Sequence, residues 1–133
     1  MRDPQGRSHR LPVPGATLRW DVLTAGLDRR AAARSLLRRE LGAAVRFSAV
    51  CPQCGGPHGP LTATLPDGRA PLVSVAYADP LVVVGVAPRG ARAFGIDAEL
   101  DSPSRRRAVL EAIGSSELFD WTRLEAIAKA RHL

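Results

Sequence analysis

The stretch FGIDAEL at residues 94–100 decides how this chain folds and where its chemistry lies. Its apolar run is short and contains two carboxylates, Asp97 and Glu99, which are two residues apart. In a β-strand both of these side chains would leave the same face, while Ile96 and Ala98 would face the other way. The stretch therefore predicts a strand with a pair of carboxylates on one face.

A second stretch, WTRLEAIAKA at residues 121–130, adds a third carboxylate and a lysine. Glu125 and Lys129 are four residues apart in a helix-forming segment, so they are expected one turn apart on a single helical face. A strand pair of carboxylates facing a helical carboxylate would offer oxygen ligands to one hard cation. Mg²⁺ suits such a site best, because it is usually held by one or two carboxylates together with substrate phosphates and several waters.

The first helix of the chain is predicted over residues 29–41. Asp28 is suited to cap its N-terminus, and Gly42 is suited to end it. Its arginines, at positions 29, 30, 34, 38 and 39, are interpreted as the solvated basic face of an amphipathic helix. The apolar residues that would form its buried stripe are Ala32, Leu36, Leu37 and Leu41.

Predicted strands dominate the middle of the chain, and they span residues 45–50, 61–65, 72–77 and 81–87. The sequence Pro-Asp-Gly at 66–68 predicts a hairpin between the second and the third of these strands. The last strand is apolar throughout, which is typical of a fully buried strand.

The remaining segments complete one domain. Residues 1–16 are predicted to form a disordered lead-in, without the apolar core of a signal peptide, to a single domain over residues 17–133. Residues 11–20 are too rich in Pro and Gly for a regular element, although their end could pair as an edge strand. A short helix is expected over residues 102–113, and a final helix from Ser115 or Thr122 onward. This order predicts an α+β fold with an antiparallel sheet and packed helices.

Composition limits the classes of protein that the chain can belong to. With 133 residues and 45% apolar content it can bury one core. Its formal charge of +6 suits an anionic partner such as a phosphate-rich cofactor, an acidic protein or nucleic acid. Lys129 is its only lysine. No apolar stretch approaches the roughly 20 residues that span a bilayer, so a cytoplasmic protein without a membrane partner is expected.

The loop CPQCGGPHG at residues 51–59 has the residue types of a zinc site. Cys51, Cys54 and His58 could supply three ligands, but a closed structural site has four, and the sequence has no second cysteine pair. Another histidine or another chain could supply the fourth ligand. The default interpretation is a structural loop with two free thiols, because a disulfide is disfavoured in a reducing cytoplasm.

Four segments, in this order, resemble the 4'-phosphopantetheinyl transferase superfamily of the surfactin-synthetase-activating type. ARSLLR at residues 33–38 and the loop at 51–59 resemble the first helix and the Cys-x-x-Cys-Gly-x-x-His-Gly loop of many members. GIDAE at residues 95–99 and the stretch at 121–130 resemble the family's Gly-Ile/Val-Asp-x-Glu strand and Trp-x-x-Lys-Glu-Ala-x-x-Lys helix. The resemblance, which begins near Asp28, implies an enzyme of the holo-acyl-carrier-protein synthase type. Such an enzyme transfers phosphopantetheine from coenzyme A to a serine of an acyl or peptidyl carrier protein, in polyketide or nonribosomal peptide biosynthesis.

The resemblance also implies a role for each motif residue. Asp97, Glu99 and Glu125 would hold Mg²⁺ against the pyrophosphate of coenzyme A, and Glu125 would deprotonate the attacking carrier serine. Lys129 would contact phosphate. These roles agree with general chemistry, since phosphoryl transfer chiefly needs positioning, charge neutralisation and a base near the incoming hydroxyl. The other residues expected to bind coenzyme A are Arg30, Arg34, Ser74 and Tyr77.

The sequence departs from the family at several of these positions. The family's Ser-x-Ser-His strand stands here as Ser74-Val-Ala-Tyr77, in which the tyrosine hydroxyl is able to donate to phosphate in place of histidine. Leu124 replaces the first lysine of the helix motif, and no basic residue follows His58-Gly59. Family members also continue beyond the lysine helix into further strands. A C-terminally shortened fold is therefore expected, with a homo-oligomer covering the incomplete second lobe.

Other functions stay open on the sequence alone. A repurposed or inactive family member could bind a carrier protein or a pantetheine-containing ligand, or catalyse a different biosynthetic reaction. A nucleic-acid-binding protein is disfavoured, because only charge supports it and no interleaved aromatics or binding motif accompany the arginines. Simpler interpretations of the second stretch are a capping box of Thr122 with Glu125 and a surface pair of Glu125 with Lys129.

Overall fold

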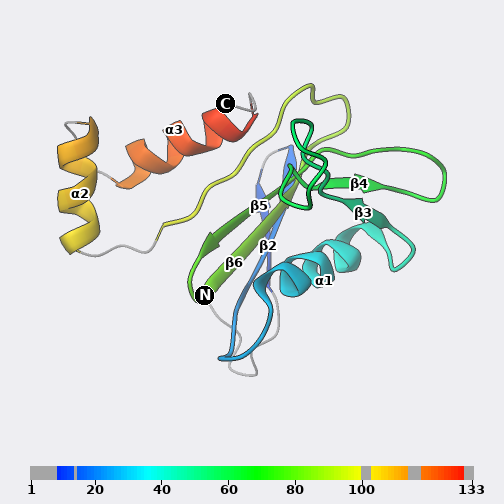
Figure 1. Ribbon diagram of the computed structural model, residues 1–133, viewed down its shortest axis with the longest axis horizontal. Coiled ribbons are helices and arrows are strands. Elements are labelled where there is room, and N and C mark those ends of the chain that lie inside the picture. The colour runs from blue at the N-terminus through cyan, green and yellow to red at the C-terminus, as the bar shows by residue number, and fades with distance from the viewer. Residues whose placement is uncertain (1–8, 14, 100–102, 114–117, 131–133) are drawn as a thin grey trace.

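The computed structural model describes residues 9–13, 15–99, 103–113 and 118–130, and it has the predicted α+β class with antiparallel sheets (Figure 1). In chain order the elements are β1 (His9–Val13), β2 (Ala16–Val22), α1 (Arg29–Leu41), β3 (Arg46–Ser48), β4 (Thr62–Thr64), β5 (Val73–Ala78), β6 (Leu81–Val86), α2 (Pro103–Ile113) and α3 (Leu118–Ala130). Among the described residues, no helix combines the length and the apolar character needed to cross a bilayer.

The main sheet has four antiparallel strands in the order β1-β2-β6-β5. β6 lies inside this sheet, as its continuous apolar sequence predicts. Its neighbours are in register with it, so that Trp20 of β2 and Ala76 of β5 both pair with Val83. β5 is the last strand in the order and leaves one edge of the sheet unpaired within it.

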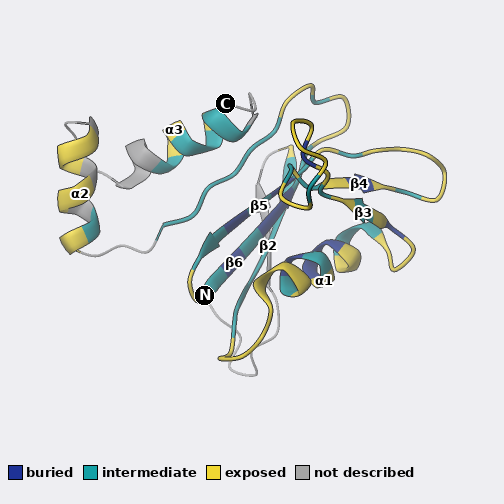
Figure 2. Ribbon diagram, viewed as in Figure 1, coloured by how far each residue is buried: buried dark blue, intermediate teal, exposed yellow. Residues whose placement is uncertain are grey.

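The core forms where α1 packs on one face of this sheet (Figure 2). Ala33, Leu36 and Leu37 of the helix are buried against Val82 and Val84 of β6. Residues two apart on a strand share a face, which explains why the two valines meet the helix together. Burial of these apolar side chains is the main force that holds α1 to the sheet.

Both predicted ends of α1 are confirmed. The side chain of Asp28 accepts a hydrogen bond of 3.0 Å from the backbone N–H of Arg30, so it satisfies one of the free donors of the first turn. Gly42 ends the helix at a φ of 100°, a conformation that glycine adopts most easily, and its N–H donates to the carbonyl of Arg38.

The hairpin predicted around residues 66–68 is wrong, because the two strands that flank the turn do not pair with each other. The turn itself is present, because the N–H of Leu65 donates to the carbonyl of Arg69 at 2.8 Å. However, β4 pairs with β3 in a separate two-stranded sheet, while β5 pairs with β6. A turn motif fixes a local reversal of the chain, but long flanking segments let the two strands join different sheets.

The N-terminal segment also differs from the expectation of a disordered lead-in over residues 1–16. Residues 9–13 form β1, which pairs with β2, and residues 1–8 lie outside the described part of the chain. β2 is not an edge strand, because it lies between β1 and β6. Pairing on both sides overcomes the weak local preference of this Pro- and Gly-containing stretch.

The predicted strand at residues 94–100 is wrong, because residues 94–99 belong to no strand and Leu100 lies outside the described residues. A side chain at Gly85 would place its Cβ 2.9 Å from the ring of Phe94, so this ring packs directly on β6. The N–H of Ile96 donates to Oγ of Ser74 at 3.1 Å. Gly85 and Ser74 are cross-strand partners on the face opposite to Val82 and α1. The segment therefore covers the second face of the sheet instead of extending its edge.

Both predicted C-terminal helices are present, and α2 ends at Ile113 as expected, whereas α3 begins at Leu118, between the two predicted starts at Ser115 and Thr122. α2 and α3 pack against each other and lie to one side of the sheet, away from α1 (Figure 1). This arrangement brings the end of α3 beside the segment at residues 94–99, which positions the candidate site.

Candidate functional site

A cavity of about 700 Å³ lies along the free edge of β5. Its walls come from α1, from β5 and the residues 70–72 before it, from the loop at residues 57–61 with the start of β4, from the segment at 92–94 and from the end of α3. All five residues that the resemblance assigns to coenzyme A line this one cavity, although they are far apart in the sequence. They are Arg30, Arg34, Ser74, Tyr77 and Lys129.

Positive charge is concentrated in this cavity. Besides Arg30, Arg34 and Lys129, its lining includes Arg92, and no Asp or Glu is among the described residues that line it. Sequence reasoning missed Arg92, because nothing in the turn-rich segment at 88–93 distinguishes it from the many other arginines. A cationic cavity of this size is suited to an extended phosphate-containing ligand.

The arginines of α1 are mostly exposed, as the predicted solvated face requires, and some of them also stack on aromatic rings. The guanidinium of Arg29 lies 4.8 Å from the centre of the Tyr77 ring, and that of Arg38 lies 5.3 Å from the centre of the Phe47 ring. Such stacking orders these two guanidinium groups. Arg30 and Arg34 line the cavity, so α1 contributes two cations to its wall.

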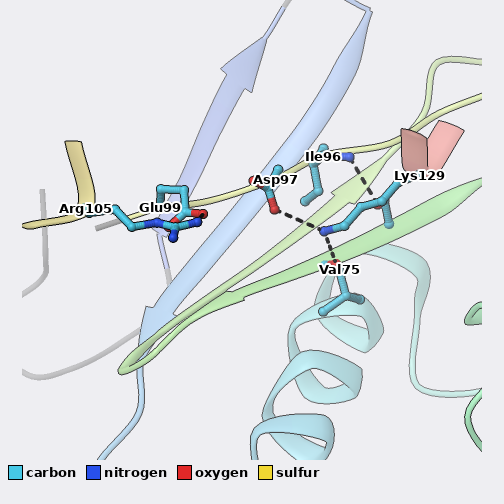
Figure 3. A network of polar contacts seen from close by, with 7 residues as sticks. Val75, Ile96, Asp97, Glu99, Arg105 and Lys129 are labelled. Atoms are coloured by element: carbon cyan, nitrogen blue, oxygen red, sulfur yellow. Dashed lines mark hydrogen bonds and ion pairs between the residues drawn. The ribbon is translucent and has the colours of Figure 1, made fainter. Parts of the chain in front are cut away.

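Lys129 connects this cavity to the carboxylate motif (Figure 3). Its Nζ donates to the backbone carbonyl of Val75 at 3.3 Å and to Oδ1 of Asp97 at 3.4 Å. The side chain of Asp97 is 13% exposed and that of Lys129 is 35% exposed. The lysine therefore joins α3, β5 and the 94–99 segment at one point.

Asp97 has a second oxygen whose environment is unusual. Oδ2 is buried and has no hydrogen-bond partner among the described residues. Leaving a buried carboxylate oxygen without a partner costs free energy, so such atoms are rare in folded proteins. This oxygen is suited to accept a cation or a donor group.

Glu99 is held by Arg105 of α2. The guanidinium donates from Nε to Oε2 at 3.0 Å and from the second nitrogen, Nη2, to Oε1 at 2.6 Å, so that it grips both carboxylate oxygens (Figure 3). This hydrogen bonding raises the pKa of Arg105, and the charges of Glu99, Asp97 and Glu125 add to the effect. All three motif carboxylates therefore act on one guanidinium.

The three carboxylates expected to bind Mg²⁺ are near one another without meeting at a single point. Asp97 contacts Lys129, Glu99 contacts Arg105, and the half-buried Glu125 lies on α3. Among the residues that the structure describes, the one group of three possible metal ligands whose atoms lie within 4.8 Å of one another is Cys51, Cys54 and His58. Two basic side chains thus neutralise the acidic corner. Arg105 was not identified from the sequence, because its Arg-Arg-Arg run gives no sign of which member turns inward.

Ser74 and Tyr77 take different positions in the cavity wall. Ser74 is 9% exposed, and its Oγ accepts the N–H of Ile96, so that it anchors the 94–99 segment as well as lining the cavity. Burial raises the pKa of Tyr77, an effect that the nearby positive charges of Arg29 and Arg30 oppose only in part. Its hydroxyl therefore stays protonated at neutral pH and is able to donate a hydrogen bond.

Comparisons of the chain with models of protein families, with curated proteins and with solved structures found no match. Any proposal for the function of this chain therefore rests on the residues and geometry of the cavity.

Proposed function

We propose that this protein binds coenzyme A in the cavity beside β5 and transfers its phosphopantetheine group to a serine of a carrier protein. The observation that carries the proposal is that Arg30, Arg34, Ser74, Tyr77 and Lys129 line one cationic cavity. In a transferase of this family the same residues would bind the phosphates of coenzyme A. Such a cofactor carries several phosphate charges, for which arginine is a preferred partner.

The proposed reaction is a displacement at phosphorus. The carrier serine oxygen forms a bond to the phosphorus that bears pantetheine, and the bond from this phosphorus to the bridging pyrophosphate oxygen breaks. Glu125 accepts the serine proton, and adenosine 3',5'-bisphosphate leaves. Lys129 lines the cavity, and its amine is oriented by a hydrogen bond to Asp97. This amine is therefore suited to contact a phosphate oxygen in the cavity.

Mg²⁺ is part of this proposal, with Asp97, Glu99 and Glu125 as the residues that would hold it. Asp97 fits this role as it stands, because its Oδ2 is buried without a hydrogen-bond partner in the described part of the chain. Glu99 would first have to leave Arg105, which now holds both of its oxygens. When bound, the metal would neutralise negative charge on the pyrophosphate.

The proposal is tested by incubating the full chain with coenzyme A, Mg²⁺ and several apo carrier proteins and measuring the carrier mass. We expect the mass to rise by one phosphopantetheine group. Glu125→Gln should slow transfer by about a hundredfold or more, because it removes the base. Lys129→Ala should weaken coenzyme A binding by about tenfold to a hundredfold. Arg123→Ala, an exposed position on the same helix, is the control and should change neither. If no carrier gains mass while a known transferase modifies the same carriers, the proposed reaction is wrong.

A second candidate function is binding of a pantetheine-containing ligand or a carrier protein without transfer. The grip of Arg105 on Glu99 favours it, because this contact occupies a carboxylate that the reaction would need. The same experiment separates the two functions. Binding of coenzyme A measured by calorimetry, weakened in Lys129→Ala but unaccompanied by a mass shift of any carrier, would support the second function over the first.

A further inference from the structure

The loop at residues 51–59 gathers three side chains that the cavity chemistry does not use. The two thiol sulfurs of Cys51 and Cys54 and an imidazole nitrogen of His58 lie within 4.8 Å of one another. Sγ of Cys54 is 2.9 Å from Nε2 of His58. In a tetrahedral zinc site the ligand atoms are about 3.5 to 3.8 Å apart, given Zn–S and Zn–N bonds of about 2.3 and 2.1 Å. Side-chain shifts of about 1 Å would therefore complete such a site.

The backbone of this loop is built to hold the thiols in place. The N–H of Gly55 donates to the carbonyl of Cys51 at 2.8 Å, and the N–H of Gly56 donates to Sγ of Cys54 at 3.3 Å. At Gly59 an added Cβ would be 2.2 Å from the carbonyl oxygen of Val50, so only glycine allows the loop to close this tightly. The three ligands are therefore brought together by the chain itself, not by loose side chains.

The loop also leaves a route by which a metal can reach the three ligands. Cys51 is buried, while Cys54 and His58 are exposed, so a metal could enter from solvent. Both cysteines are free, and no disulfide competes for the sulfurs.

We propose that Cys51, Cys54 and His58 bind one Zn²⁺, with the fourth position open to water at the rim of the cavity. Two sulfurs and one nitrogen are a ligand set that prefers Zn²⁺ over Mg²⁺ or Ca²⁺. Among the described residues no fourth Cys, His, Asp or Glu joins this group, and three protein ligands are typical of zinc sites that keep an exchangeable position. His58 also lines the cavity, together with Pro57, Gly59 and Pro60. The metal would therefore hold one wall of the cavity in place, and this proposal does not depend on the transfer reaction.

The test uses the full chain without a histidine tag, purified in a reducing buffer and loaded with Zn²⁺ or Co²⁺. We expect one Zn²⁺ per chain to remain after gel filtration. The Co²⁺ form should show the sulfur-to-cobalt charge-transfer band and the strong visible bands of a tetrahedral site. Free imidazole should shift these bands, because it replaces water at the open position.

Cys54 and His58 are exposed, so substitutions at these two ligands test the site without disturbing the core. Cys54→Ser and His58→Ala should each lower Zn²⁺ affinity by at least about a hundredfold, since even residues that only orient a ligand contribute up to that factor. Gln53→Ala, an exposed position in the same loop, is the control and should bind like the parent. Circular dichroism checks that each variant is folded. Loss of Zn²⁺ from the parent chain, or parent-like affinity in folded Cys54→Ser and His58→Ala, would overturn the site. A cobalt spectrum that imidazole does not shift would overturn the open position.

Discussion

Lys129 is the residue at which the two stretches that decide the fold come together. Its sequence spacing pairs it with Glu125 on one helical face, but its amine donates to Asp97, 32 residues away, and to the carbonyl of Val75. An amine that bridges a carboxylate and a carbonyl is held more firmly than one in an ordinary surface pair. The helix is thus attached to the sheet edge by its only lysine.

Tyr77 provides a test of the cavity at the level of one residue. It is the only tyrosine in the chain, so ultraviolet titration of tyrosinate reports its ionisation alone. Burial raises the pKa of Tyr77, so we expect a midpoint above about 10, the value of an exposed tyrosine. A midpoint at or below that value would contradict the buried environment.

The same shift has a consequence for stability. Below about pH 10 the hydroxyl is neutral in both the folded and the unfolded chain, and its contribution to stability is fully present. As the pH rises from there through the higher folded pKa of Tyr77, the unfolded chain ionises first and the contribution is lost. Melting temperatures measured across this range should therefore fall more steeply for the parent than for Tyr77→Phe.

The sequence was enough to predict which residues line the cavity, but not how the three carboxylates are arranged. The residues proposed for coenzyme A do line one cavity, because their motifs lie on α1, β5 and α3, which meet there. The packing of α1 and β5 in one core follows from apolar patterning. The grouping of Asp97, Glu99 and Glu125 about one metal was not predictable in this way. Which cation lies beside each carboxylate depends on Lys129 and Arg105, whose partners are set by the packing of α2 and α3.

At the scale of elements, local signals succeeded where burial and capping agreed. Asp28, Gly42 and the apolar stripe of α1 define a helix whose predicted bounds are those observed. Local sequence signals failed for residues 94–99, where apolar and acidic residues alternate as they would in a strand. Whether such a segment pairs along an edge or crosses a face depends on the sheet beneath it, here on Gly85 and Ser74.

Gly85→Ala tests this crossing of the sheet face. The new Cβ would lie 2.9 Å from Cζ of Phe94 and 3.1 Å from Cδ2 of Leu18, so the ring must move. We expect a loss of about 1 to 3 kcal/mol in the free energy of unfolding, measured by denaturant titration. Phe94→Leu removes the clashing end of the ring, so the double variant should lose less than the sum of the two single variants. Strictly additive losses would show that the ring does not pack on β6.

At the scale of the whole molecule, α2 and α3 leave apolar side chains in contact with solvent. Leu110 is 49% exposed, Leu124 is 51% exposed and Ile127 is 38% exposed. Three exposed large apolar side chains on two neighbouring helices are typical of a surface that another chain covers. The homo-oligomer expected from the sequence stays a prediction, and these helices are where the second copy would bind.

Light scattering on the purified chain tests this prediction. We expect a mass at least twice that of one chain, and a return to one chain mass in Leu124→Glu, because a charge in the interface is costly to bury. Leu27→Glu is the matched control, since Leu27 is 62% exposed but precedes α1, far from α2 along the chain. A stable monomer of the parent chain in dilute solution would contradict the oligomer.

Lys129 carries the only ε-amine of the chain, so this one position in the cavity can be labelled chemically. Reductive methylation with isotope-labelled formaldehyde would place a side-chain label at Lys129 alone, apart from the N-terminal α-amine. The resulting nuclear magnetic resonance signal would come from the junction of Asp97, Val75 and the cavity. A ligand screen could then be read from one peak, without assigning the rest of the spectrum.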